Sequence, residues 1–456
     1  MSITIYPKPN ETSAAFESLA FDVFVREHGK DWRELFTYFA RNMIKTGRDP
    51  MVLDSMTFVY FDTDFAENVD VRVVFKDKDV EGIESVKIRP LSRGIEFVQR
   101  DSRTVEFSID KPMNISVEIN GNIYENLMIF AGKAEEAVTS ATYYFPPGVH
   151  DAGAITLHSG ESVYIAGGAW VYGTIISSDA ADISVRGRGV LCGTMTPQVY
   201  MRCGANMINF NRCTDCAIEG IIIVDSSGWG IVPIDCRDLR ISGVKMMNCR
   251  ISSDGIDPCG CENLMMDNLF LRVPDDCISI KALGKNPNKN ITVRDSILWA
   301  DCAHAVLIGP EGNGTYTEDV LFENIDILEV NCHWPNFWGA LAITNGDDMT
   351  IQRVAFKDIR IEPFSVHPMS TTMFNIRIED NFFTSSPGGP VKDVLFKDID
   401  FCGDNSKANV LQGYSAERNV SGVVFENVRV NSEVVTDIGA LNVEAGEFVE
   451  DVIVKK

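Results

Sequence analysis

Short apolar runs alternate with turns through the first part of the chain. In residues 69–73 every second side chain is apolar, an alternation typical of a strand with one buried face. Turns such as Asn120-Gly121 separate further runs of this kind, which lie at 57–61, 85–88, 104–107 and 115–118. Many short strands with regular turns predict a β-sandwich over residues 1–140. The apolar spacing between Trp32 and Met43 fits either a helix or strands, and both interpretations stay open.

Residues 141–456 carry a repeat of seven positions. Most copies read polar, apolar, variable, apolar, variable, then Asn, Asp or Gly, then Ile, Val or Leu. The copies begin at Asp215, Asp238, Asn263, Asn290, Asp319, Arg353, Asp393 and Gly422. A short strand that recurs at this period buries its apolar face only by stacking on its neighbours, so the repeat predicts a solenoid. Helical periodicity is almost absent and the signature of leucine-rich repeats is missing. The predicted fold class is therefore all-β, an N-terminal β-sandwich followed by a parallel β-helix.

The cysteines fit this stacking. Eleven of the twelve lie between Cys192 and Cys332, and several recur near the starts of the repeats, as Cys213, Cys236 and Cys261 do. A metal cluster would need paired ligands such as the CxxC knuckles of zinc sites, and these spacings do not resemble them. The pattern favours cysteines stacked in the interior, with no metal and no cofactor.

The chain carries 41 Lys and Arg against 65 Asp and Glu, a net charge of −24. A nucleic-acid partner or an anionic membrane needs clustered Lys and Arg, so we expect neither. No stretch of 18 apolar residues is present, which argues against a transmembrane helix. The first residues lack the features of a signal peptide, so we expect a cytoplasmic protein unless a signal peptide has been removed. Self-association into a homo-oligomer stays open.

The strongest candidates for chemistry are acids spaced by about one coil. Asp254 and Asp275 are 21 residues apart, and Asp276 follows directly. Adjacent coils of a parallel β-helix lie about 5 Å apart, so the three carboxylates should gather on one face. Crowded carboxylates do not all ionise together, and hydrolysis of a glycosidic bond needs one protonated acid beside ionised carboxylates. His304, one coil later, is placed to hydrogen-bond these acids.

Two other interpretations of these acids stay open at this point. Acidic residues are common in solvated turns between strands, where they have no catalytic role. Clustered carboxylates also suit a hard cation such as Ca²⁺.

The same residues resemble motifs of the β-helical polygalacturonases of glycoside hydrolase family 28 and of the related dextranases and isopullulanases of family 49. The first family's signature reads Asn-Thr-Asp-Gly, Asp-Asp-Cys, Gly-His-Gly and Arg-Ile-Lys. Its counterparts here are residues 252–255, 275–277, 303–305 and 377–379. The segments similar to the sandwich-bearing family-49 enzymes are 88–92, 107–112, 116–121 and 164–169. The resemblance covers nearly the whole chain and implies a right-handed, pectin-lyase-like parallel β-helix.

The resemblance also implies roles for individual residues of an inverting hydrolase. Asp275 would be the general acid, Asp254 and Asp276 would activate the attacking water, and His304 would support the acid–base pair. The substrate would be an oligosaccharide or polysaccharide. Arg377 would bind the sugar near the point of cleavage. Tyr414 falls about where the family has a tyrosine that contacts the substrate.

The departures from the family pattern bear on the substrate. Ser252 replaces the family's Asn, and Ala303 and Ala305 replace two glycines, which leaves the reacting groups intact. Glu379 replaces a lysine that polygalacturonases use to hold a galacturonate carboxylate. A glutamate there would repel an acidic sugar and could accept hydrogen bonds from hydroxyl groups, so the sequence favours a neutral sugar.

Aromatic rings and one further acid are candidates for sugar subsites. Trp299, Trp334 and Trp338 could stack on sugar faces, although packing within the protein is the alternative for each. Glu311, shortly after His304, could reach the same groove.

Two other functions stay open. A polysaccharide lyase or epimerase on the same fold would act on uronates and combine Ca²⁺ with a basic residue, which the acidic balance and Glu379 disfavour. A non-catalytic carbohydrate-binding solenoid would explain the fold and the aromatic residues, but not the three acids and the histidine.

Overall fold

The computed structural model describes residues 3–9, 16–44, 52–136, 138, 140–197, 206–332, 339–364, 372–380 and 382–456 of the chain. Within these residues the regular elements are strands, apart from a short 3-10 helix, η2 (Leu91–Arg93). No helix in this part of the chain is long and apolar enough to cross a membrane. The predicted all-β class is confirmed.

The N-terminal strands form two packed sheets. One sheet has the order β1 (Thr4–Ile5), β5 (Val52–Thr63), β11 (Leu127–Lys133), β10 (Met113–Ile119), β7 (Val86–Arg89), with β4 (Tyr38–Ile44) also paired to β5. The other has the order β3 (Arg33–Leu35), β2 (Phe21–Glu27), β6 (Val69–Phe75), β9 (Thr104–Ile109), β8 (Phe97–Gln99). Buried apolar residues between the sheets, such as Val23, Val59 and Val71, form the sandwich core.

The ambiguous segment between Trp32 and Met43 folds as the strands β3 and β4. Antiparallel pairing runs along the whole of β4, from Tyr38 opposite Phe58 to Ile44 opposite Val52. The Tyr38 ring stacks on Phe58 with centroids 4.9 Å apart. Aromatic contacts across a sheet therefore account for the spacing that also fits a helix.

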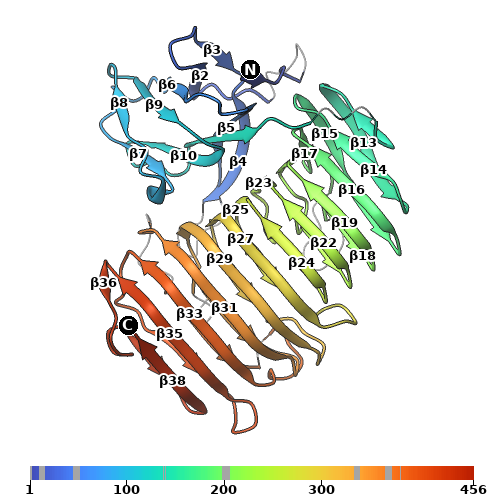
Figure 1. The fold of residues 1–456 in the computed structure, drawn as a ribbon, viewed down its shortest axis with the longest axis vertical. Coiled ribbons are helices and arrows are strands. Elements are labelled where there is room, and N and C mark those ends of the chain that lie inside the picture. The colour runs from blue at the N-terminus through green and yellow to red at the C-terminus, as the bar shows by residue number, and fades with distance from the viewer. Residues whose placement is uncertain are drawn as a thin grey trace.

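The rest of the chain winds into a right-handed parallel β-helix (Figure 1). The long sheet consists of β12 (Tyr143–Phe145), β13 (Gly148–Leu157), β14 (Ser162–Ile165), β15 (Ala169–Ser178), β16 (Ala181–Gly187), β17 (Val190–Cys192), β18 (Ile208–Asn211), β19 (Thr214–Glu219), β20 (Ile222–Val224), β21 (Ile231–Ile234), β22 (Arg237–Ser242), β23 (Lys245–Met247), β24 (Glu262–Asp267), β25 (Phe270–Val273), β27 (Asn288–Ala300), β29 (Tyr316–Val330), β31 (Thr350–Ile361), β33 (Val391–Phe401), β35 (Val420–Val430), β36 (Glu433–Val434) and β38 (Val449–Lys455). A second sheet consists of β26 (Ile278–Ile280), β28 (Val306–Ile308), β30 (Leu341–Asn345), β32 (Phe374–Ile378), β34 (Asn409–Gln412) and β37 (Val443–Ala445). The second sheet is the one on which the candidate site lies.

The repeat of the sequence matches the register of the coils. All eight starting residues adopt positive φ, between 53° and 70°, a conformation that Gly, Asn and Asp adopt most readily. Their side chains also bond between coils, since Asn263 Nδ2 donates to Asp238 Oδ1 and Asn290 Nδ2 to Asn263 Oδ1, both at 2.8 Å. The polar residue that opens each repeat is therefore a corner of the coil.

The interior is filled by side chains that stack from coil to coil. The rings of Phe322, Phe356, Phe396 and Phe425 follow one another at centroid distances of 5.0–5.2 Å. In the earlier coils the same column consists of aliphatic residues and a methionine: Val293, Met266, Ile241, Ile218 and Val185. The cysteines occupy other interior positions, and the described part of the chain keeps them as free thiols. Ten of these eleven described cysteines are buried, so interior stacking is confirmed.

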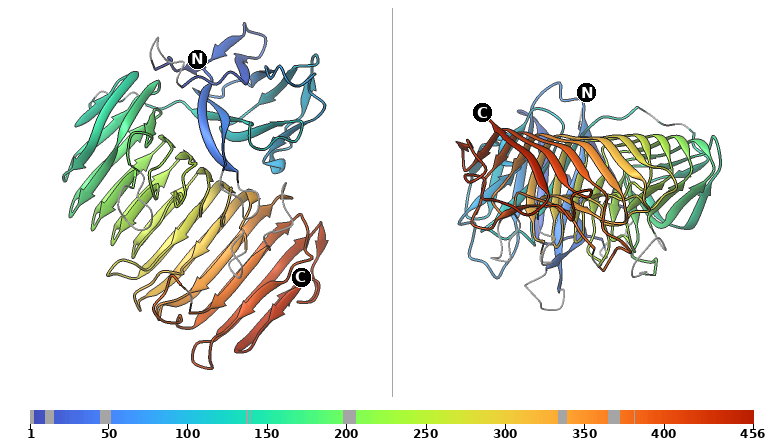
Figure 2. Two further views of the ribbon diagram at one scale, coloured as in Figure 1. Left: turned by 180° about the vertical axis from the view of Figure 1, so that it is seen from behind. Right: turned by 90° about the horizontal axis from the view of Figure 1, so that it is seen from below.

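The sandwich lies against one side of the solenoid, and the last coils extend beyond it (Figures 1 and 2). The contact is apolar: Tyr38, Phe58 and Phe130 of the sandwich share one buried cluster with Phe270 and Trp299 of the solenoid. The Phe130 and Phe270 rings meet edge to face at 5.1 Å. Along this contact, the sandwich covers the solenoid and excludes solvent from it.

Candidate active site

Three successive coils present a polar side chain at the same position. Asp254, Asp276 and His304 each lie two residues before the residues that pair in the parallel register Ile256–Ile278–Val306. The three side chains therefore stack in one column at the coil spacing of about 5 Å. Backbone N–H···O=C hydrogen bonds between the coils hold the register at this point.

The predicted carboxylate group forms at this column. Asp254, Asp275 and Asp276 each offer an oxygen that lies within 4.8 Å of the oxygens of the other two. Asp254 and Asp276 are buried, with 3% and 6% of their surface exposed, whereas Asp275 is partly exposed. The structure thus brings together the three acids that the sequence spacing predicts, at the boundary between protein and solvent.

His304 is bound to one of these acids. Its Nδ1–H donates to Asp276 Oδ1 at 2.6 Å, and its backbone N–H donates to the same oxygen at 3.1 Å. Burial raises the pKa of Asp276, but His304 outweighs it and holds the pKa below its ordinary value. Burial lowers the pKa of His304, whereas Cys332 and Asp276 raise it, and it lies well above its ordinary value. The pair is therefore an ionised carboxylate beside an imidazolium.

A buried lysine, Lys281, pairs with the first acid of the column. The sequence pattern did not single out this lysine. Lys281 Nζ lies 3.2 Å from Asp254 Oδ2 and 3.2 Å from Oδ1 of the fully buried Asp257. The ammonium also lies 3.7 Å from the centroid of the Trp229 ring. Burial lowers the pKa of Lys281, but its carboxylate neighbours outweigh burial and raise the pKa well above its ordinary value. Lys281 therefore remains protonated and cannot act as a general base.

The three carboxyl groups differ in pKa because their surroundings differ. Burial, followed by the charges of Asp254 and Asp276, raises the pKa of Asp275 well above its ordinary value. Burial also raises the pKa of Asp254, which Lys281 limits to about 6. The site can therefore hold a protonated Asp275 while Asp276 is ionised.

The donor set also bears on a bound metal. Three carboxylate oxygens within 4.8 Å would suit a divalent cation, and among the described residues this is the group with that geometry. The Lys281 ammonium, 3.2 Å from Asp254, already supplies positive charge and would repel a cation. The environment therefore suits proton transfer better than Ca²⁺ binding.

The residues predicted to bind substrate lie further along the same sheet. Arg377 is in β32, two coils beyond the coil of His304, and its Nε donates to Asn375 Oδ1 at 3.0 Å. Burial lowers the pKa of Arg377, while the nearby Glu379 and Glu444 act in the opposite direction. Glu444, in β37, follows a segment without a family motif, and sequence analysis did not identify it.

Two further predicted residues lie at the surface of this region. Tyr414, after β34, is 49% exposed. Glu311 Oε2 lies 3.8 Å from Lys281 Nζ and lines a pocket of about 570 Å³ with Leu283, Asn313 and Phe382. Glu311 therefore lies between Lys281, which contacts Asp254, and an open cavity.

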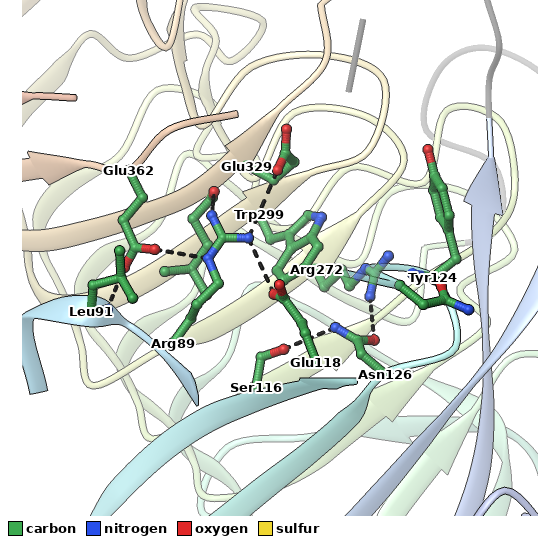
Figure 3. A network of polar contacts seen from close by, with 12 residues as sticks. Arg89, Leu91, Ser116, Glu118, Tyr124, Asn126, Arg272, Trp299, Glu329 and Glu362 are labelled. Atoms are coloured by element: carbon green, nitrogen blue, oxygen red, sulfur yellow. Dashed lines mark hydrogen bonds and ion pairs between the residues drawn. The ribbon is translucent and has the colours of Figure 1, made fainter. Parts of the chain in front are cut away.

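The prediction that Trp299 binds a sugar is wrong. Its side chain is fully buried (0% exposed), and the guanidinium carbons of Arg272 and Arg89 lie 4.2 and 5.2 Å from its ring centroid (Figure 3). The sandwich covers this side of the solenoid, which is why an aromatic residue here packs against protein. Trp334 and Trp338 lie outside the described residues.

Comparisons with known proteins show which enzymes the chain resembles. The model of the family "Glycosyl hydrolases family 28" matches residues 193–447. Among curated proteins, an endo-polygalacturonase of Pectobacterium parmentieri is 24% identical over 246 residues, which cover 52% of this chain and 56% of that protein. A probable polygalacturonase of Arabidopsis thaliana is 29% identical over 153 residues, 27% of this chain and 34% of that protein. The matches thus span about half or less of the relatives' length.

Solved structures share the fold. Dex49A from Penicillium minioluteum superposes with a TM-score of 0.64 and 16% identity over 99% of this chain and 96% of that one. A family 28 exopolygalacturonase of Yersinia enterocolitica gives a TM-score of 0.53 and 12% identity over 84% and 96%. The first of these similarities extends over both the sandwich and the solenoid.

The raised pKa of Asp275 predicts how its replacement changes stability. A raised carboxyl pKa costs stability as pH rises, because the folded protein holds a proton that the unfolded chain releases above about pH 4. Asp275→Asn should therefore raise the thermal unfolding midpoint at pH 8 by about 2–4 °C, and leave it unchanged near pH 3.5. Circular dichroism melts of both proteins at the two pH values check this.

Asp110→Asn is the matched control, because Asp110 lies on the exposed turn after β9. It should leave the midpoint unchanged at both pH values. If the unfolding midpoint of Asp275→Asn at pH 8 is lower than that of the wild type, the raised pKa of Asp275 is contradicted.

Proposed function

Since the chain belongs to the glycosyl hydrolases of family 28, we propose that it hydrolyses glycosidic bonds of an oligosaccharide or polysaccharide with inversion at the anomeric carbon. The observation that carries this proposal is the group of three aspartate oxygens within 4.8 Å, beside a histidine bonded to one of them. These are the acid and base that glycoside hydrolysis needs.

Asp275 is the proposed general acid. It is the most accessible of the three, and its raised pKa keeps a proton available near neutral pH. That proton passes to the glycosidic oxygen as the bond from this oxygen to the anomeric carbon breaks. The leaving sugar departs as an alcohol, and positive charge develops at the anomeric carbon, which the ionised carboxylates nearby stabilise.

Asp254 and Asp276 are proposed to hold the attacking water. One water donates two hydrogen bonds of about 2.8 Å at a near-tetrahedral angle, which reach acceptors about 4.5 Å apart, so oxygens that lie within 4.8 Å of each other can share it. One carboxylate takes a proton of the water as its oxygen bonds to the anomeric carbon. His304 acts by keeping Asp276 ionised, and Lys281 does the same for Asp254.

A neutral sugar is the proposed substrate. The ammonium of Lys281 lies among Asp254, Asp257 and Glu311, and so it is already neutralised. The charge of Arg377 is opposed by Glu379 and Glu444. Neither cation is thus available for a uronate carboxylate, whereas carboxylates readily accept hydrogen bonds from sugar hydroxyls.

A uronic sugar is the second candidate. It is supported by the names of the curated relatives, which are polygalacturonases. In that case Arg377 would bind the carboxylate of the sugar, with Glu379 turned toward a hydroxyl group.

The other two functions fit less well. A lyase or epimerase needs a base that removes the C5 proton, and Lys281 is held in its charged form. A purely binding solenoid has no use for buried carboxylates, which cost stability.

Asp275→Asn should abolish turnover. An amide cannot protonate the leaving oxygen, and loss of a general acid lowers kcat by about 10²–10⁴-fold. The assay is release of reducing sugar from a panel of neutral and uronic oligosaccharides, with Asp110→Asn as control.

The same assay separates the alternatives. Activity that disappears with a chelator, or a product with the absorbance of an unsaturated uronate, would identify a lyase. Full turnover in Asp275→Asn would remove Asp275 as the acid.

Glu379→Lys should shift preference toward uronic substrates. A lysine beside Arg377 restores a cationic pair, and we expect the ratio of kcat/KM for uronic over neutral substrate to rise about tenfold or more, the effect of about 1.4 kcal/mol. Glu379→Gln, which removes the negative charge without adding a positive one, should fall between the two. An unchanged ratio in Glu379→Lys would contradict the assignment of Glu379 to specificity.

A further inference from the structure

A buried polar network joins the sandwich to the two coils of the solenoid that carry Asp275 and His304. Arg272 is fully buried, and its Nε and Nη2 donate to Asp301 Oδ2 and Oδ1, both at 3.3 Å. Trp299 Nε1 donates to the same carboxylate at 2.9 Å, and its ring carries the Arg272 guanidinium 4.2 Å from its centroid. The pair is therefore held in one geometry by partners on several sides.

The two members of this ion pair precede the reacting residues by equal steps. Arg272 lies three residues before Asp275, and Asp301 lies three residues before His304. Between them the backbone N–H of Asp301 donates to Val273 O at 2.8 Å. At the far end of the same two turns, His304 Nδ1 donates to Asp276. The two turns are thus braced at both ends, by Arg272–Asp301 and by His304–Asp276.

The third nitrogen of the Arg272 guanidinium is held by the sandwich. Nη1 donates to Asn126 Oδ1 at 2.8 Å and more weakly to Met56 Sδ at 3.8 Å (Figure 3). Asn126 is itself fixed, because its Nδ2 donates to Ser116 Oγ at 2.8 Å and its backbone oxygen accepts from Thr57 N at 3.0 Å. The sandwich therefore supplies a rigid acceptor to an arginine that belongs to the solenoid.

We propose that the N-terminal sandwich is a positioning part of the active site, which acts through Asn126 on the Arg272–Asp301 pair and so on the turns that carry Asp275, Asp276 and His304. The inference rests on the proposed function for its effect on turnover, but its structural effect does not. Small displacements of reacting groups lower the rate of reaction by large factors. Asn126, Arg272 and Asp301 position these groups without binding the substrate, so their loss should affect kcat more than KM.

Asn126→Ala removes the oxygen acceptor and leaves Arg272 Nη1 with only the weak sulfur acceptor of Met56. We expect kcat to fall about tenfold or more while KM stays within about twofold. Asn126→Asp keeps the acceptor and should retain kcat within about threefold. Ser92→Ala is the matched control, because Ser92 Oγ joins the sandwich to Asp326 at 2.8 Å in a contact that does not lead to these turns.

A second measurement needs no turnover. The chain has six histidines, so a titration of ¹⁵N-labelled histidine by NMR resolves His304. In Asn126→Ala the loosened His304–Asp276 contact should lower the pKa of His304 from its raised value, and in Ser92→Ala it should not. Ser116→Ala, a milder change that frees the Asn126 amide, should shift His304 in the same direction by less.

The outcomes separate this inference from the proposed function. If the wild type hydrolyses no sugar tested, the proposed function fails and the His304 titration alone decides the inference. An Asn126→Ala protein that is folded, with kcat and the His304 titration both unchanged, would overturn it. Equal losses of kcat in Asn126→Ala and Ser92→Ala would also overturn it, because they would reflect destabilisation of the whole interface.

Discussion

The parallel, in-register stacking of the coils is the constraint on which the rest of the structure depends. Each coil pairs with the next through backbone hydrogen bonds, so residues at one position of successive coils form a column. Inside the solenoid, the columns are apolar ladders such as the stacked phenylalanines. On the outer face of the β26 sheet, one column reads Asp254, Asp276, His304. The spacing that packs the core therefore also sets the separation of the acids.

That separation creates an electrostatic conflict, which two cations resolve in different ways. Three carboxylates so close together cannot all be ionised at little cost. Lys281 limits the rise in the pKa of Asp254, and His304 holds that of Asp276 low. For Asp275, burial and the charges of Asp254 and Asp276 outweigh Lys281, so its pKa lies well above its ordinary value and it keeps a proton most readily. The proposed acid and base roles thus follow from how strongly a cation acts on each carboxylate. Burying these carboxylates destabilises the folded protein, and the apolar ladders and the interface with the sandwich offset this cost.

Local features of this fold and site could be predicted from sequence, and features that depend on docking could not. The coil corners require positive φ, so Asn, Asp and Gly recur at Asp238, Asn263 and their equivalents and reveal the period. The acids follow from that period. By contrast, Trp299 is buried because the sandwich packs on it, and Lys281 matters because Asp257 lies beside it out of solvent. Glu444, which raises the pKa of Arg377, lies in a coil without a motif. These contacts depend on tertiary structure, which short patterns do not encode.

In the proposed mechanism, water held by Asp254 and Asp276 attacks the anomeric carbon while Asp275 protonates the leaving oxygen. Carboxyl groups about 5 Å apart are typical of retaining hydrolases, in which a carboxylate attacks the sugar directly, so stereochemistry separates the two mechanisms. Proton NMR of the first product, recorded before its anomers equilibrate, tests the claim most directly. We predict that the new reducing end has the anomeric configuration opposite to that of the bond cleaved. A product with the original configuration would contradict it and would make one of the aspartates a nucleophile.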